Sequence, residues 1–162
     1  MLGCKNCIID SGCPKNQSDL ARSPWHRRCD GDAIVQAITT FRNLVAWNRA
    51  IDLVVLLYQI SDGFPRHELY GLVSQLRRAA VSIPANIAEG NSRLSTAAYL
   101  NHVHVALGSL GELRALIEVA SRLGFVAEAD QPRIYSQLDE VGRLLGGLRA
   151  ALKRRLSAVP DP

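Results

Sequence analysis

The residues of this chain that could bind a metal or attack a substrate are few, and the densest group is four cysteines. They are Cys4, Cys7, Cys13 and Cys29, with His26 nearby. Thiolates and imidazoles bind structural zinc, usually as two closely spaced ligand pairs. Only Cys4 and Cys7 have that spacing, so a zinc site is the weaker interpretation. The stretch has no basic segment followed by an apolar one, as a secretory signal would, so we expect reduced thiols rather than disulfides.

The histidines and carboxylates farther along are not spaced for catalysis. His102 and His104 lie two positions apart, which on a helix places them on different faces. Di-iron bundles use Glu-x-x-His pairs, and none of Glu89, Glu112 and Glu118 has a histidine three residues later. The sequence contains no Gly-rich phosphate loop, G-x-S-x-G elbow or H-E-x-x-H motif. We therefore expect no enzyme activity, and no cofactor, metal or small-molecule substrate.

Basic side chains are the remaining groups with a chemistry of their own, because a guanidinium can bind phosphate through two hydrogen bonds. The chain has 19 Lys+Arg and 15 Asp+Glu, for a net charge of +4. Residues 41–162 hold 14 basic and 11 acidic residues, and the stretch from Arg143 to Arg155 has five basic residues and no acidic one. The candidate nucleic-acid contacts are Arg77, Arg78, Arg93, Arg149, Lys153, Arg154 and Arg155.

The stretch from Gln75 to Gly90 places polar residues on an otherwise apolar helix. Arg77 and Glu89 lie about three helical turns apart, too far to pair with each other. We expect each to meet a partner on another helix, and Arg93 is a candidate for Glu89. The favoured interpretation is a buried polar network that fixes helix register; the alternative is contact of these arginines with a ligand or RNA. The structural members of the motif are Pro84, Asn86, Glu89, Gly90 and Ser95.

Four segments with helical spacing must position these residues, because apolar side chains recur in them at three- and four-residue steps. The first stripe is Leu44, Trp47, Ile51, Val54 and Tyr58, and the second is Leu69, Leu72, Leu76, Ala80, Ile83 and Ile87. The third is Tyr99, Val103, Ala106, Leu110, Leu113, Ile117 and Ala120, and the fourth is Ile134, Leu138, Val141, Leu145, Leu148, Leu152 and Leu156.

Turn and cap signals separate the stripes. The run Asp62-Gly63-Phe64-Pro65 ends the first helix, and Gly124 stops the third. Ser95 is a plausible N-cap for the third helix, and Gly90 predicts a left-handed C-cap for the second. Pro84 predicts a kink near residues 80–84. The Gly146-Gly147 pair in the fourth helix indicates a close approach of another helix.

These elements predict an all-α fold, an antiparallel up-down four-helix bundle with a kinked second helix. The bundle is expected over residues 41–158, with a tail at 159–162. Residues 1–40 lack sustained apolar periodicity and are predicted to be a disordered extension, or to follow from a start codon placed too early. No apolar run reaches the roughly 18–20 residues of a membrane span, so we expect a cytoplasmic protein that does not bind membranes.

The stretch from Gln75 to Gly90 belongs to a longer pattern. The further elements are Leu44 with Ala46-Trp47, Tyr58, Phe64-Pro65, Glu68-x-x-Gly71-Leu72, Arg93-x-Ser95 and Ala106-x-Gly108-Ser109-Leu110-x-Glu112-Leu113. With this pattern, residues from about Phe41 to Leu156 resemble the 23S rRNA intervening-sequence proteins, the S23 family of four-helix bundles. The matching motif residues are Arg77, Arg78, Asn86, Glu89, Arg93 and Ser95, for which a structural role is favoured.

The resemblance implies several properties that the residue pattern alone does not. Family members form up-down bundles and ring-like homo-oligomers, pentamers in the known cases, and some are encoded within intervening sequences of bacterial 23S rRNA genes. Related accessory proteins of diversity-generating retroelements use a basic ring to bind the reverse transcriptase and its RNA. No member is an established enzyme. The resemblance therefore implies a homopentamer whose partner is RNA or a nucleic-acid-processing protein.

Three functions from different classes fit the sequence. The leading one is a non-enzymatic homo-oligomer that associates with RNA or acts as an adaptor. Its rival is a structural or protein-interaction bundle with no nucleic-acid role, which the nearly balanced charge of residues 41–162 also fits. The third is a metal-dependent enzyme that uses the N-terminal cysteines.

Overall fold

A computed structural model describes residues 40–158 and shows four α-helices. A 3-10 helix, η3 (Phe41–Asn43), precedes α2 (Val45–Ser61), and a second one, η4 (Arg66–Glu68), leads into α3 (Leu72–Asn91). Two longer helices follow, α4 (Thr96–Arg122) and α5 (Gln131–Ser157). The part of the chain that the structure describes contains no strand, so the predicted all-α class is confirmed. The predictions for residues 1–39 and 159–162, including those for Cys4, Cys7, Cys13 and Cys29, lie outside the described residues.

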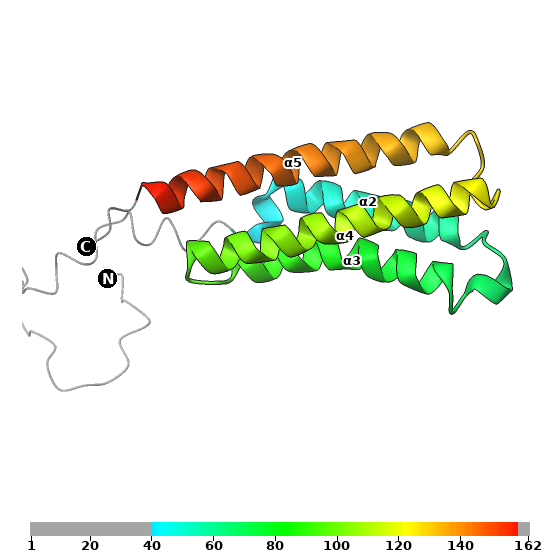
Figure 1. Cartoon of the computed structure of the whole chain (residues 1–162), viewed down its shortest axis with the longest axis horizontal. Helices are drawn as coiled ribbons and strands as arrows, with labels where there is room; N and C mark the ends of the chain where they lie inside the picture. Colours follow the sequence, from blue (N-terminus) through cyan, green and yellow to red (C-terminus); the bar gives the residue numbers. More distant parts are fainter. Residues whose placement is uncertain (1–39, 159–162) are drawn as a thin grey trace, which may run out of the picture. The chain divides into compact units, whose positions relative to one another are not determined.

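The helices form a bundle in which each helix packs against two others. In turn, α2 contacts α3, α3 contacts α4, α4 contacts α5, and α5 returns to α2. Short connections reverse the chain at each end, so consecutive helices run antiparallel (Figure 1). Helices of this length are marginal alone in water, and burying their apolar faces together stabilises them. None of the helices in residues 40–158 is long and apolar enough to cross a membrane.

The core agrees with the predicted stripes of α4 and α5. In α4, the six stripe residues after Tyr99 are buried, and in α5 all are buried except Leu148, which is half-buried, and the exposed Leu156. Full burial of one such side chain is worth about 1.5–3 kcal/mol. The α3 stripe is buried from Leu76 onward, but Leu69 lies in the turn before α3 and is 49% exposed, so its assignment to the core is wrong.

The predicted face of α2 is wrong by one position. The buried residues include Ala46, Ala50, Leu53 and Leu57, each just before a residue of the predicted stripe. Apolar residues occupy every position from Leu53 to Leu57, so spacing permits either face. The small Ala46 and Ala50 are buried, whereas the larger Trp47 is half-buried and packs against the core, and Ile51 is half-buried.

Two glycine predictions are also wrong. Gly90 lies inside α3, which continues to Asn91 and ends in a right-handed conformation, so it is not a left-handed C-cap. A Cβ at Gly90 would meet the Tyr99 ring and lie 2.8 Å from the His102 Cβ, and it is this glycine that permits close helix approach. At Gly146 and Gly147, where close approach was expected, a Cβ would meet no atom within 4 Å.

The other sequence signals for helix ends and kinks concern Ser95, Gly124 and Pro84. Ser95 caps α4, because its Oγ accepts a hydrogen bond of 3.4 Å from the Ala98 backbone N–H. Gly124 follows α4 with φ 75°, the left-handed conformation that favours glycine. Pro84 is buried within α3, which runs through it without interruption, and the kink there stays a prediction.

The glycines give a matched pair of stability tests. Gly90→Ala should lower the free energy of unfolding by about 1–3 kcal/mol, because the methyl overpacks the contact with α4. Gly147→Ala should raise it by about 0.5–1 kcal/mol, because alanine favours the helix and meets no neighbour. Urea unfolding followed by circular dichroism measures both. Equal effects of the two substitutions would show that α3 and α4 are not in close contact at Gly90.

Candidate functional site

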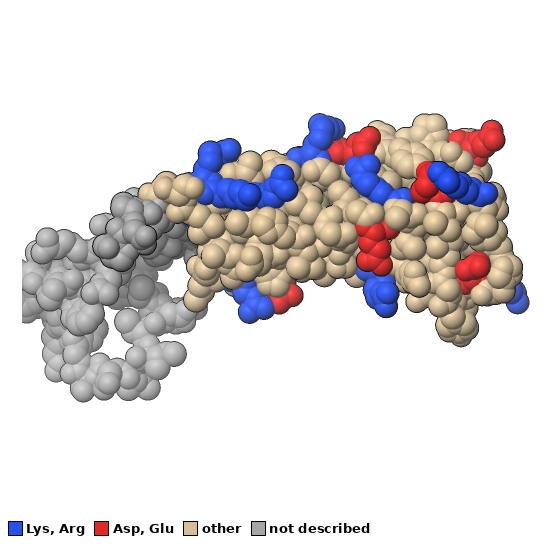
Figure 2. Space-filling model, in the orientation of Figure 1, with Lys and Arg blue, Asp and Glu red and all other residues tan. Residues whose placement is uncertain are grey.

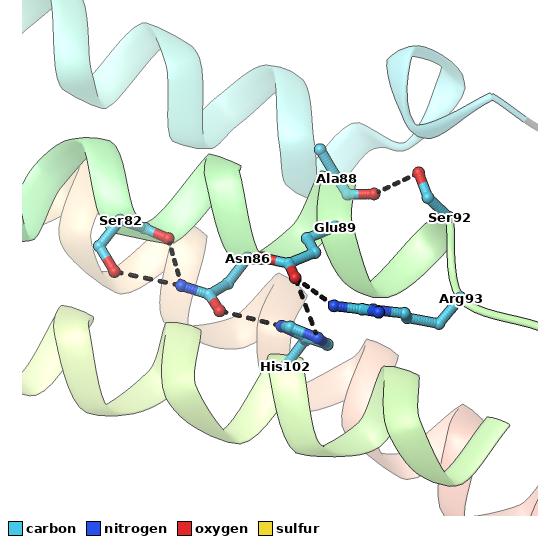
Figure 3. A network of polar contacts seen from close by, with 7 residues as sticks. All are labelled: Ser82, Asn86, Ala88, Glu89, Ser92, Arg93 and His102. Atoms are coloured by element: carbon cyan, nitrogen blue, oxygen red, sulfur yellow. Dashed lines mark hydrogen bonds and ion pairs between the residues drawn. The ribbon is translucent and has the colours of Figure 1, made fainter. Parts of the chain in front are cut away.

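A polar network joins the C-terminal half of α3 to α4 (Figure 3). The Asn86 amide Nδ2 donates to the Ser82 carbonyl at 2.9 Å and to the Ser82 Oγ at 3.2 Å. Its Oδ1 therefore faces His102 Nδ1 at 3.1 Å, and because this oxygen only accepts, Nδ1 carries the proton. Ser82 Oγ also shares a hydrogen bond of 2.8 Å with Ser109 Oγ of α4.

The same network continues to the end of α3. Glu89 Oε1 pairs with Arg93 and lies 3.8 Å from His102 Nε2, so His102 is held between an amide and a carboxylate (Figure 3). Arg93 thus supplies the partner that was expected for Glu89, but from just after the end of α3 and not from another helix. The network is half-buried rather than buried, since the Asn86 and His102 side chains are partly covered while about half of each of the Glu89 and Arg93 side chains is exposed.

The chemistry that this network offers is structural. Among residues 40–158, His102 forms a side-chain hydrogen bond only with Asn86, lies 3.8 Å from the Glu89 carboxylate, and bonds to no hydroxyl or thiol that it could activate. The same residues contain no group of three His, Cys, Asp or Glu that could hold a metal ion. His104 is exposed on α4, away from the half-buried His102. The network therefore links α3 to α4 through the Asn86–His102 and Ser82–Ser109 hydrogen bonds, and its role in fixing helix register stays a prediction.

Arg77, one of the candidate nucleic-acid contacts, forms a second set of polar contacts between helices. Its Nε donates to Ser61 Oγ at 2.8 Å and its Nη2 donates to Asp62 Oδ1 at 2.5 Å, both at the C-terminal end of α2. Its guanidinium also lies 4.5 Å from the centroid of the Tyr58 ring. Ser61, a buried polar residue, gains a partner in this way. Arg77 is thus committed to the fold, whereas the neighbouring Arg78 is exposed and has no ion-pair partner within residues 40–158.

The part of α5 from Arg143 onward carries the densest positive charge. Its cations, called here the α5 basic strip, are Arg143, Arg149, Lys153, Arg154 and Arg155. All are exposed, and none forms an ion pair within the described residues. Figure 2 shows blue side chains gathered over the orange-to-red part of α5 in Figure 1, while red side chains lie farther toward the start of the helix.

The carboxylates of α5 explain why its two halves differ. Asp139 and Glu140 lie in the first half, where Arg114 Nη2 is 2.8 Å from Asp139 Oδ1 and Arg49 Nε is 3.1 Å from Glu140 Oε1. No acidic residue occurs from 141 to 158. The candidate nucleic-acid contacts thus fall into three groups. Arg77 and Arg93 pair with carboxylates, Arg78 is an exposed cation of α3, and the other four belong to the α5 basic strip.

Sequence reasoning missed one cluster, where α5 begins beside the end of α4. Tyr135 Oη donates to Glu118 Oε2 at 2.9 Å, and Arg122 Nε donates to Glu118 Oε1 at 2.8 Å. The hydrogen bond from Arg122, and next that from Tyr135, lowers the pKa of Glu118, while the bond to this carboxylate raises the pKa of Tyr135. The Glu118–Arg122 spacing of four was visible in the sequence. Tyr135 was not, because its partner lies on another helix.

The family model for the 23S rRNA-intervening sequence protein matches residues 42–147. The chain belongs to this family. The resemblance seen in the sequence is thereby confirmed, and the family is not a known enzyme family. None of the curated proteins matches the chain.

The family match covers the α3 cations but only the first cation of the α5 basic strip. It includes the polar network of α3, with Arg77, Arg78 and Arg93, and also Arg143, but it ends at residue 147. Arg149 and the three basic residues that follow Leu152 lie beyond it. For these four cations the interpretation depends on geometry and charge, and not on family membership.

The Glu118 cluster predicts a pH effect. Tyr135→Phe should move the pKa of Glu118 up toward its ordinary value of 4.5, and Arg122→Gln should move it farther, because Arg122 is the larger cause. Carboxyl-carbon NMR titration measures both shifts. A pKa lowered by folding contributes stability above the unfolded value, and this stability is lost as pH falls through the folded pKa. Unchanged Glu118 titration in both variants would contradict the cluster.

Proposed function

We propose that this protein is a non-enzymatic RNA-associated protein that binds phosphates through the α5 basic strip. The observation that carries the proposal is the strip itself, five exposed cations with no acidic residue from 141 to 158. Nucleic-acid affinity begins with the neutralisation of phosphates by Lys and Arg. The family name, which refers to 23S rRNA, supports a role near RNA.

The arrangement of the strip suits a chain of phosphates. From Arg143 to Arg155 the helix rises by about 18 Å, so the cations are spread along its axis instead of crowding at one point. Arg149 and Lys153 lie one turn apart on the same side. Four of the five are arginines, whose planar groups can bind a phosphate through two hydrogen bonds.

A homo-oligomer, which the family resemblance implies as a pentamer, would strengthen this interaction. The monomer has a modest net charge of +4, whereas a ring of copies brings several strips into one field. A ring of this kind could hold RNA or present it to a nucleic-acid-processing enzyme in the cytoplasm.

Binding of single-stranded RNA by the full chain tests the proposal. Reversing two strip charges, Arg149→Glu with Lys153→Glu, should lower affinity at low salt more than tenfold. It should also reduce the slope of log K against log salt by about 0.7 for each phosphate that the variant no longer neutralises. Fluorescence anisotropy at several salt concentrations gives both quantities.

The control makes the same change of net charge elsewhere. Arg66→Glu with Arg133→Glu alters two exposed arginines that form no ion pair within residues 40–158, one in η4 and one near the start of α5. This variant should bind RNA nearly as the natural protein does. Equal reductions in both variants would show that only net charge matters. Absence of RNA binding at low salt would favour the rival, a structural or protein-interaction bundle.

A further inference from the structure

An open hollow with apolar walls lies apart from the α5 basic strip, between the end of α2 and the first half of α3. Its volume is about 600 Å³, and its lining includes Tyr58, Leu69, Tyr70, Arg77, Arg78 and Val81. We call it the α3 groove. In Figure 1 the end of α2 and the start of α3 lie at one end of the bundle and the C-terminus of α5 lies at the other, so the groove and the strip are separate surfaces.

The walls of the groove expose more apolar surface than the fold requires. Tyr70 is 91% exposed and Leu69 is 49% exposed, and Tyr58 and Val81 are each about two-fifths exposed. A single exposed apolar residue is ordinary, but several around one concavity are typical of a binding surface. Tyrosine is also among the residues that contribute most to binding energy at protein interfaces.

The charges around the groove decide what kind of partner it fits. Arg77 is neutralised by Asp62, and its guanidinium packs on Tyr58, so it supports a wall of the groove. Arg78 is the only other charged residue of the lining, and it has no ion-pair partner within residues 40–158. One unpaired cation between apolar walls is a poor match for RNA and a good match for an apolar segment with one carboxylate.

We propose that the α3 groove binds a short segment of a partner protein that carries an apolar side chain and a neighbouring carboxylate. The apolar side chain packs among Leu69, Tyr70 and Val81, and the carboxylate pairs with Arg78 through two hydrogen bonds. Arg77 acts as a positioning residue that holds the Tyr58 ring in place. The proposal assigns to Arg78 a protein contact in place of the RNA contact expected from the sequence, and it does not depend on RNA binding by α5.

Selection from a displayed library of random peptides of about 12 residues on the full-length protein tests this assignment. The selected peptides should combine aromatic or aliphatic residues with Asp or Glu, and fluorescence polarisation should give their affinities. Tyr70→Ser should weaken binding at least tenfold, without altering the thermal unfolding midpoint, because Tyr70 is exposed. Leu94→Ser is the matched control, since Leu94 is fully exposed outside the groove and its replacement should leave binding unchanged.

A charge exchange tests the pairing with Arg78. Arg78→Glu should weaken the acidic peptides at least tenfold and strengthen the same peptides when their carboxylate is replaced by Lys. Absence of enriched peptides, full binding by Tyr70→Ser, or failure of the charge exchange would overturn the proposal.

Two further measurements identify a different occupant. If Tyr70→Ser or Arg78→Glu lowers RNA affinity as much as reversal of the α5 charges, the groove is part of an RNA interface. If either variant changes the sedimentation mass of the protein, the groove is an interface between copies of this chain. Either result would overturn the assignment to a separate partner protein, while unchanged RNA affinity and mass would support it.

Discussion

The contact of α3 with α4 at Gly90 sets the spacing on which the motif of this family depends. Tyr99 and His102 occupy the space that a side chain at Gly90 would need, and from there the His102 ring reaches Asn86 on one side and Glu89 on the other. A larger residue at Gly90 would push α4 away and separate these groups. The contacts between the polar residues of α3 and His102 of α4 therefore depend on the close approach of the two helix backbones at Gly90.

The fold also determines which cations remain available for partners. Arg77 joins α3 to the end of α2 through Asp62, Arg93 pairs with Glu89 at the end of α3, and Arg49 and Arg114 pair with carboxylates in the first half of α5. Among the candidate nucleic-acid contacts, those without an ion-pair partner within residues 40–158 are then the cations of the α5 basic strip and, beside the apolar walls of the α3 groove, Arg78. A surface of many unpaired cations suits phosphates, whereas a concave apolar surface with one cation suits a protein segment.

The sequence predicted the fold class, the family, and the buried faces of α4 and α5, because these helices have clear apolar stripes. It did not predict the face of α2, where five consecutive apolar residues make the spacing ambiguous, nor the role of Gly90, which depends on residues of another helix. The partners of Arg77 and Tyr135 were hidden for the same reason. The α3 groove combines residues of α2, a turn and α3, so no local pattern in the sequence could indicate it.

The central claim is that RNA contacts α5 and not the α3 groove, and arginine footprinting tests it most directly. Phenylglyoxal modifies accessible arginines, and mass spectrometry reports the extent at each one with and without single-stranded RNA. The account predicts that RNA protects Arg149, Arg154 and Arg155 and leaves the reactivity of Arg78 unchanged. Protection of Arg78, or no protection of the α5 arginines, would contradict it.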